Sequence, residues 1–230
     1  MNDEIIKYRL SFSKTDKMRY IGHLDLLTYF QRAIKRAEIP ISYSKGFNPH
    51  QQMSFAMPLP LGMSGTAEYV DIQLDVPMEC EEIKNRLNAQ MSLGMEITSV
   101  RRMEQGEDTG AALLRAADYT AVLDRKITDI ETRITELEKD EEWLIEKVGK
   151  KKKVREIDIK PLIYSLDCNN DSENTVIRTR IASGSNENLK VDLLLKYLYE
   201  KMGYDLDFVK IKVTRTALLK QDENGGFSNL

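Results

Sequence analysis

The order in which strand-like and helix-like periodicities follow one another is the strongest constraint on the fold of this chain. Residues 7–13 alternate apolar and polar side chains, which is typical of a half-buried strand. Residues 23–38 instead repeat apolar side chains every three or four positions, which indicates an amphipathic helix. The expected apolar stripe consists of Leu24, Leu27, Phe30, Ile34 and Ala37. The pattern β-α-β-β-α-β is completed by two strands, a helix and a last strand, over residues 52–57, 67–74, 78–91 and 96–102.

A second series of periodic segments follows an acidic, glycine-punctuated boundary at residues 103–110. It comprises a strand, a helix, two hairpins, a helix and a strand, over residues 117–123, 128–139, 143–157, 161–183, 188–202 and 207–216. We therefore expect an α+β protein of two tandem ferredoxin-like (split β-α-β) units, with antiparallel sheets and helices on one face. The expected domains are residues 1–104, residues 111–220 with an extra hairpin, and a disordered tail over 221–230.

The composition is that of a globular protein, with 41% hydrophobic and 31% charged residues. No apolar run approaches the roughly 20 residues that a membrane span needs, so we expect no membrane association. No secretory signal pattern is visible at the N-terminus. Cys80 and Cys168 have no metal-binding or redox spacing. These features favour a cytoplasmic location.

Charge is distributed unevenly along the chain, although the formal net charge is only −3. Residues 1–60 carry nine Lys and Arg against five Asp and Glu, whereas the remainder carries 25 against 32. A basic N-terminal part on an acidic chain suggests a localised anionic partner.

Residues 19–69 concentrate the unusual side chains. They hold both histidines, four of the six prolines and seven of the 17 aromatic residues. The loop that follows the first helix combines a proline, which fixes its own φ, with glycine and asparagine, which tolerate unusual turn conformations, in residues 46–50. One interpretation is a structural loop whose Phe47 fills the core, and the other is a site whose shape matters to a ligand.

The two histidines, His23 and His50, are candidate catalytic residues. Together they could perform general acid–base chemistry such as phosphodiester cleavage, with Lys45, Arg19 or Arg36 stabilising the developing charge. His23 could equally cap its helix. A metal held with Asp25 or Glu68 would need a ligand spacing that the sequence lacks, so no metal site is predicted.

A binding role draws on a wider group of residues. Cations beside aromatic rings are the mixture that holds single-stranded RNA. The candidate RNA- or partner-binding residues are Arg19, Asp25, Arg32, Lys35, Arg36, Tyr43, Ser44, Lys45, Phe47 and Asn48. Weaker positive spots lie at Lys150–Lys153 and at Lys210 and Lys212 on the expected last strand. The cations of the helix are also compatible with an ordinary solvated face.

Several sequence boxes resemble the bacterial family of radical SAM-linked proteins. The boxes are HLDL (23–26), YSKGFNPH (43–50), SFAMPLPLG (54–62) and EYVDIQL (68–74), with weaker landmarks at REIDIKPLI (155–163), NLK (188–190) and VTRTALL (213–219). Gln51 and Val191 stand where relatives commonly have proline. The resemblance implies an association with radical SAM enzymes or RNA metabolism. A looser likeness to tandem ferredoxin-like endoribonucleases concerns the fold.

These observations lead to one hypothesis and two alternatives. The leading hypothesis is an accessory protein that presents RNA, such as tRNA or rRNA, to a separate enzyme, with a radical SAM protein as the expected partner. One alternative is a metal-independent endoribonuclease that uses His23 and His50. The other is an interaction module that docks a radical SAM partner through residues 43–62. No DNA specificity is expected. No cofactor is expected either, because phosphate-loop, dinucleotide and iron–sulfur motifs are missing.

Overall fold

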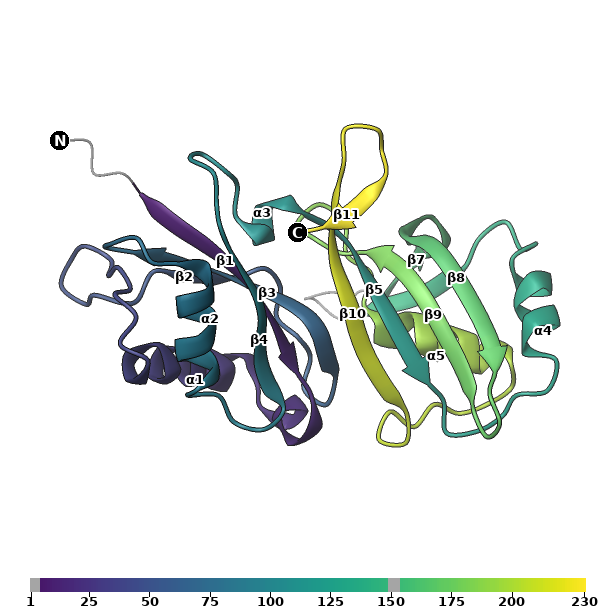
Figure 1. Ribbon diagram of the computed structural model, residues 1–230. Helices are drawn as coiled ribbons and strands as arrows, with labels where there is room; N and C mark the ends of the chain where they lie inside the picture. Colours follow the sequence, from purple (N-terminus) through teal and green to yellow (C-terminus); the bar gives the residue numbers. More distant parts are fainter. Residues whose placement is uncertain (1–4, 149–153) are drawn as a thin grey trace. The chain divides into compact units, whose positions relative to one another are not determined.

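The computed structural model describes residues 5–148 and 154–230 of the chain (Figure 1). Two compact units are present, and each has a mixed α+β fold. The first unit comprises Met1–Leu114 and Arg215–Leu230, and the second comprises Arg115–Thr214. Within the described residues, every helix is too short or too polar to span a bilayer.

The first unit is built on antiparallel strands. Its elements are β1 (Ile6–Lys14), the 3-10 helix η1 (Asp16–Tyr20), α1 (His23–Arg36), β2 (Met53–Phe55), β3 (Ser64–Leu74), α2 (Cys80–Asn88), β4 (Met95–Arg102) and α3 (Gly110–Leu113). In the sheet, β1 lies between β4 and β3, and β2 pairs with β3. The chain returns to this unit through β10 (Lys212–Gln221), which neighbours β3, and β11 (Phe227–Asn229), which pairs with β10.

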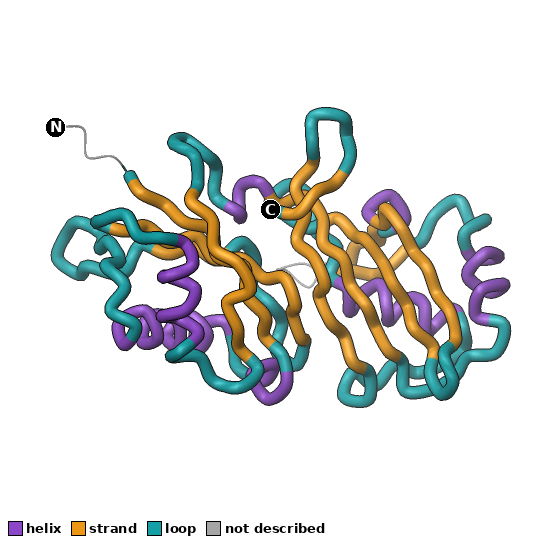
Figure 2. The backbone as a smooth tube through the Cα atoms, viewed as in Figure 1, coloured by secondary structure: helices purple, strands orange, loops and turns teal. Residues whose placement is uncertain are grey.

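The core of the first unit lies between one sheet face and the helices α1 and α2. β1 buries Tyr8, Leu10 and Phe12, as the period of two predicts, but it also buries Arg9 and Ser11, so the strand is covered on both faces and is not half-buried. The ring of Phe12 meets the ring of Phe30 on α1 edge to face at 4.9 Å. Figures 1 and 2 show both helices beside the strands of this unit.

One prediction about α1 is wrong, because Leu24 points outward. Its side chain is 75% exposed, whereas Leu26 is buried. Leu26 lies one turn before the buried Phe30 and therefore shares its stripe on the helix. Leu24 lies six residues before Phe30, which places it about 120° away around the helix axis. Its exposure leaves a large apolar side chain in solvent at the start of α1.

The second unit contains a sheet in which β9 lies between β5 and β8, with antiparallel pairs. Its elements are β5 (Leu114–Val122), α4 (Ile130–Leu137), β6 (Leu144–Val148), β7 (Val154–Asp158), η2 (Lys160–Leu162), β8 (Ile163–Asn170), β9 (Thr175–Ala182) and α5 (Val191–Lys201). The expected hairpin of β6 and β7 forms a separate two-stranded ribbon. The buried indole of Trp143 stacks on Tyr197 of α5 at 5.2 Å. Lys150–Lys153, which we expected to form a positive spot, lies outside the described residues.

The C-terminal part differs from the prediction in three respects. Residues from Arg215 belong to the first unit and not to a domain spanning 111–220. The tail, expected to be disordered, forms β11, and the side chain of Leu230 is buried. Lys210 precedes β10 and pairs with Asp207 at 3.5 Å, so it does not contribute to a basic strand face.

Candidate functional site

The segment Tyr43–Gln51, which we call the clamp loop, is closed by hydrogen bonds across its base. Tyr43 and Gln51 form an isolated antiparallel bridge. The backbone N–H of Ser44 donates to the carbonyl of His50 at 2.8 Å. The Ser44 hydroxyl oxygen accepts from the backbone N–H of His50 at 3.0 Å and lies 2.8 Å from Nδ1 of the imidazole. Gly46 has φ +121°, which a side chain would disfavour. The loop therefore has a defined shape.

The aromatic side chain of Phe47 lies on the clamp loop, and its exposure decides between the two interpretations of this loop. It is fully exposed to solvent, so the interpretation that it fills the core is wrong. The clamp between Ser44 and His50 turns the chain back on itself and leaves the side chain at position 47 in solvent. The other candidate residues Tyr43, Lys45, Asn48 and His50 are also exposed, whereas Ser44 is half-buried.

The two histidines have different surroundings. His23 is the first residue of α1, and its ring meets the edge of Phe55 at 5.5 Å between centroids. Its Nδ1 is buried and has no hydrogen-bond partner in the described part of the chain. The Nδ1 of His50 is engaged by Ser44. The structure gives the two rings separate partners, and Asp25 lies exposed in the first turn of α1.

The basic flank of α1 consists of Arg32, Lys35 and Arg36, which differ in their contacts. Arg32 and Lys35 are exposed on the helix surface. Arg36 instead donates to the side-chain and backbone oxygens of Gln90, at 3.3 and 3.1 Å. Arg36 therefore helps to fix the connection after α2 and is less available to a ligand than the other two cations.

The half-buried Arg19 and the exposed Tyr20 form a cation–aromatic pair. The guanidinium carbon of Arg19 lies 4.7 Å from the centre of the Tyr20 ring. The carbonyl of Arg19 accepts from the backbone N–H of Gly62 at 2.9 Å and from Nζ of Lys14 at 3.1 Å. The backbone at Arg19 is therefore held by the proline-rich loop of residues 57–63 and by a buried lysine.

A buried ionic cluster fixes the proline-rich loop, and it was missed in the sequence analysis. Arg215 and Glu68 form a buried ion pair, with Nε of Arg215 donating to the carboxylate at 2.8 Å. Arg215 also donates to the carbonyl of Met57 at 3.1 Å. Burial lowers the pKa of the neighbouring Lys14, and the negative charge of Glu68 opposes that shift. The sequence carries no signal of this pair, because both residues stand among other charged side chains in their expected strands and lie 147 residues apart.

Residues 20–61 contain several large apolar side chains that are exposed to solvent. Leu24 and Leu61 are 75% and 66% exposed, and Tyr20, Tyr43 and Phe47 are exposed as well. Single exposed leucines are ordinary on protein surfaces, but five large apolar side chains within residues 20–61 are a concentration. This stretch contains most of the residues that the sequence analysis selected.

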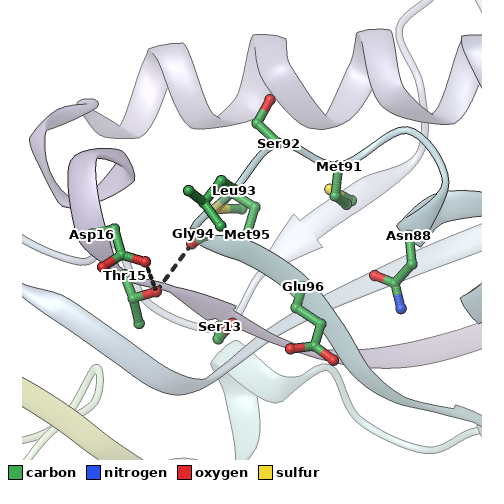
Figure 3. Close-up of a pocket in the computed structure, with 10 residues that line it drawn as sticks. All are labelled: Ser13, Thr15, Asp16, Asn88, Met91, Ser92, Leu93, Gly94, Met95 and Glu96. Atoms are coloured by element: carbon green, nitrogen blue, oxygen red, sulfur yellow. Dashed lines mark hydrogen bonds between the residues drawn. The ribbon is translucent and has the colours of Figure 1, made fainter.

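A groove of about 480 Å³ lies elsewhere in the first unit (Figure 3). It is lined by Ser13, Thr15, Asp16, Asn88, Met91, Ser92, Leu93, Gly94, Met95 and Glu96. The two ionisable lining residues are both acidic, and none of the residues selected from the sequence lines the groove. The side-chain amide of Asn88 is hydrogen-bonded to the backbone of Ile97: its Nδ2 donates to the carbonyl at 2.9 Å, and its Oδ1 accepts from the N–H at 2.8 Å. The groove therefore offers little to an anionic ligand.

The described residues contain no group of three or more His, Cys, Asp or Glu side chains arranged to hold a metal ion. Burial raises the pKa of the Cys168 thiol to about 11, which keeps it protonated near neutral pH. Cys168 is therefore a packing residue. The protonated thiol of Cys168 is not a nucleophilic thiolate.

A family described as "Uncharacterized protein conserved in bacteria (DUF2344)" matches residues 7–191, and the chain belongs to this family. The match makes no connection with radical SAM proteins. No curated protein sequence is significantly similar to the chain.

Solved structures resemble the chain at low sequence identity. One is a chain of a Cbf5-Nop10-Gar1 complex, with a TM-score of 0.50 and 12% identity. The alignment covers 94% of this chain, which spans about half (50%) of that chain. The other is an unknown protein from Galdieria sulphuraria, with a TM-score of 0.28, 16% identity and coverage of 92% and 99%. The first likeness concerns the fold alone.

Proposed function

We propose that this protein is an accessory RNA-binding protein that grips RNA through the clamp loop and the basic flank of α1. The observation that carries the proposal is the fully exposed Phe47 on a loop of defined shape. An exposed aromatic ring beside a cation is what base stacking and phosphate contact require. The enzyme that the bound RNA would serve is proposed to be a radical SAM protein, on the strength of the sequence boxes alone.

The charge around the clamp loop supports an anionic partner. Between Glu38 and Glu68 the chain has no acidic residue. The exposed Lys45 lies within this interval, and Arg32 and Lys35 lie on the preceding helix. Residues 39–67 therefore attract a polyanion through Lys45 and carry no carboxylate of their own, whereas the exposed Asp25 and Glu38 flank the two helix cations.

The strand order supports the further proposal that each unit is ferredoxin-like. In the first unit, α1 joins β1 to β2 and α2 joins β3 to β4, while the order across the sheet is β4, β1, β3 with β2 beyond it. In the second unit, β5 is followed by α4, and β9 is followed by α5. Such a split β-α-β arrangement leaves loops free to carry a binding site.

Salt dependence tests the RNA-binding proposal. We expect a short fluorescent RNA to bind the wild-type protein with an affinity that falls between about 50 and 200 mM salt. Replacing Arg32 and Lys35 by alanine should weaken binding and reduce the slope of log K against log salt by about 1.4, because two phosphate contacts are lost. A charge-matched control replaces the exposed Arg178 and Lys196 of the second unit.

Two results would contradict the proposal. One is an absence of RNA binding at low salt. The other is cleavage of RNA in EDTA that is lost in a His23→Ala, His50→Ala double variant, since this would make the protein an endoribonuclease.

A second candidate function is docking of a protein partner, and the exposure of Leu24 and Leu61 favours it. Apolar side chains that protrude into water are typical of surfaces that a partner covers. Co-purification of a partner that is lost with Leu24→Glu and Leu61→Glu, while RNA affinity stays unchanged, would support this role. Co-purification that persists in both variants would exclude it.

A further inference from the structure

We infer that the clamp loop takes a single unpaired nucleotide of RNA, with its base stacked on Phe47 and its phosphate held by Lys45 and Nε2 of His50. The inference rests on the proposed RNA-binding function and names the form of RNA that the site accepts. On this inference the clamp loop binds unpaired RNA more tightly than duplex RNA.

The base-binding part of the inference rests on Phe47. Its ring is fully exposed, so the ring offers a face to a flat ligand. The hydrogen bonds between Ser44 and His50 already order the backbone that carries the ring. Binding therefore costs little additional conformational entropy. A nucleobase covers one ring face without needing a surrounding pocket.

The phosphate-binding part rests on the orientation of His50. The Ser44 hydroxyl oxygen accepts from the backbone N–H of His50, so its proton is available to Nδ1 of the ring. A neutral imidazole that accepts at Nδ1 carries its proton on Nε2. We assign the ring this tautomer, with Ser44 as the donor to Nδ1, so that Nε2 can donate to a phosphate oxygen. The ammonium group of Lys45, two residues before Phe47, would bind the same phosphate.

The same geometry disfavours duplex RNA. Inside a double helix each base face is covered by its neighbours, and the surface presents sugars and phosphates. Phe47 could then meet only the backbone, which gives an aromatic ring no stacking partner. The clamp loop should therefore select loops, bulges or single strands.

The test compares the affinity of one RNA sequence as a fluorescent single strand and as a blunt duplex. Phe47→Ala should lower the single-strand affinity about 5- to 150-fold, the usual effect of removing one base-stacking ring. It should leave the weaker duplex affinity unchanged. Phe47→Tyr should retain the wild-type affinity because the ring is kept. Ser44→Ala should weaken single-strand binding, because it frees His50 and the loop.

The control variant is Leu93→Ala, which removes another almost fully exposed side chain, 90% exposed, from the first unit. It should bind both RNAs as the wild type does. Because Phe47 contributes nothing to the core, Phe47→Ala should also unfold at the wild-type temperature. A loss of affinity then cannot be attributed to misfolding.

Two results would overturn the inference while leaving the proposed function standing. One is equal single-strand affinity for Phe47→Ala and wild type, together with weakening by the Arg32 and Lys35 variant. The other is duplex binding as tight as single-strand binding. The absence of any RNA binding would overturn both the inference and the proposed function.

Discussion

At the scale of single residues, the first unit depends on buried charges that hold its loops. Glu68 lies between Arg215 and Lys14, and all three side chains are buried. The two cations also donate to carbonyls of Met57 and Arg19. One carboxylate therefore compensates two buried positive charges that hold the backbone of Arg19, next to the exposed Tyr20.

We predict that Glu68→Gln lowers the free energy of unfolding by about 3–5 kcal/mol, because it leaves buried cations without a counter-charge. Urea denaturation of the whole protein measures this change. Asp167→Asn is the matched control, because it removes the carboxylate of an exposed ion pair with Arg178 and should cost less than about 1 kcal/mol. Equal effects of the two substitutions would contradict the role assigned to Glu68.

Sequence patterns could select candidate site residues more readily than they could predict what each of these residues contacts. Phe47, Lys45 and His50 could be selected because aromatic, basic and imidazole groups stood in a loop rich in turn formers. The outward position of Phe47 depends on hydrogen bonds between Ser44 and His50. A sequence pattern does not specify such bonds, because the same residues could close a loop around a buried ring.

At the scale of elements, the connection between β4 and α3 is fastened to the sheet by ion pairs. Glu107 accepts from Arg101 of β4 and from Arg9 of β1, with nitrogen–oxygen distances of 2.9 and 3.2 Å. Asp71 of β3 accepts from Nε of Arg9 at 2.7 Å and from the backbone N–H of Gly110 at 2.7 Å. The segment 103–110, which we expected to be a domain boundary, is therefore held against the sheet by hydrogen bonds and ion pairs.

These contacts make a prediction about pH. Hydrogen bonds from Arg101 lower the pKa of Glu107 from 4.5 to about 2. Because the folded state binds this proton less tightly than the unfolded state, the stabilisation is complete above pH 4.5 and is lost as the pH falls toward 2. We expect the difference in unfolding free energy between wild type and Glu107→Gln to shrink over this range. A difference that is constant between these pH values would contradict the assignment.

Helices and strands were the most predictable elements. The pattern that predicted a helix over residues 23–38 corresponds to α1, and the alternation over 7–13 corresponds to β1. The period of α1 reflects burial on one side, which a sequence records directly, whereas the polar residues that alternate in β1 include the buried Arg9 and Ser11. The outward position of Leu24 was not predicted, because adjacent leucines fit more than one stripe and the core decides between them.

At the scale of the whole molecule, the chain completes its first unit only with its last residues. Arg215 belongs to this unit and pairs with Glu68, which is 147 residues away in the sequence. β11 then pairs with β10 and brings Leu230 into a buried position. Periodicity describes neighbours along the chain and carries no information on such distant pairing, so the sequence predicted the last strand but not the unit that it joins.

We predict that deleting residues 223–230 lowers the free energy of unfolding by about 1.5–3 kcal/mol, the usual contribution of one buried leucine. The deletion removes Leu230 and the strand β11. Glu223→Ala, an exposed change in the turn before β11, serves as the control and should leave stability unchanged. Unchanged stability after the deletion would mean that the tail behaves as the disordered segment predicted from the sequence.

The central proposal is that the clamp loop and the basic flank of α1 form an RNA-binding surface. Ultraviolet crosslinking of a bound RNA, followed by trypsin digestion and mass spectrometry, locates the contact most directly. We expect the RNA-linked peptide to be residues 46–84, which trypsin releases after Lys45 and Lys84 and which contains Phe47 and His50. Crosslinks confined to residues 115–214 would contradict the claim.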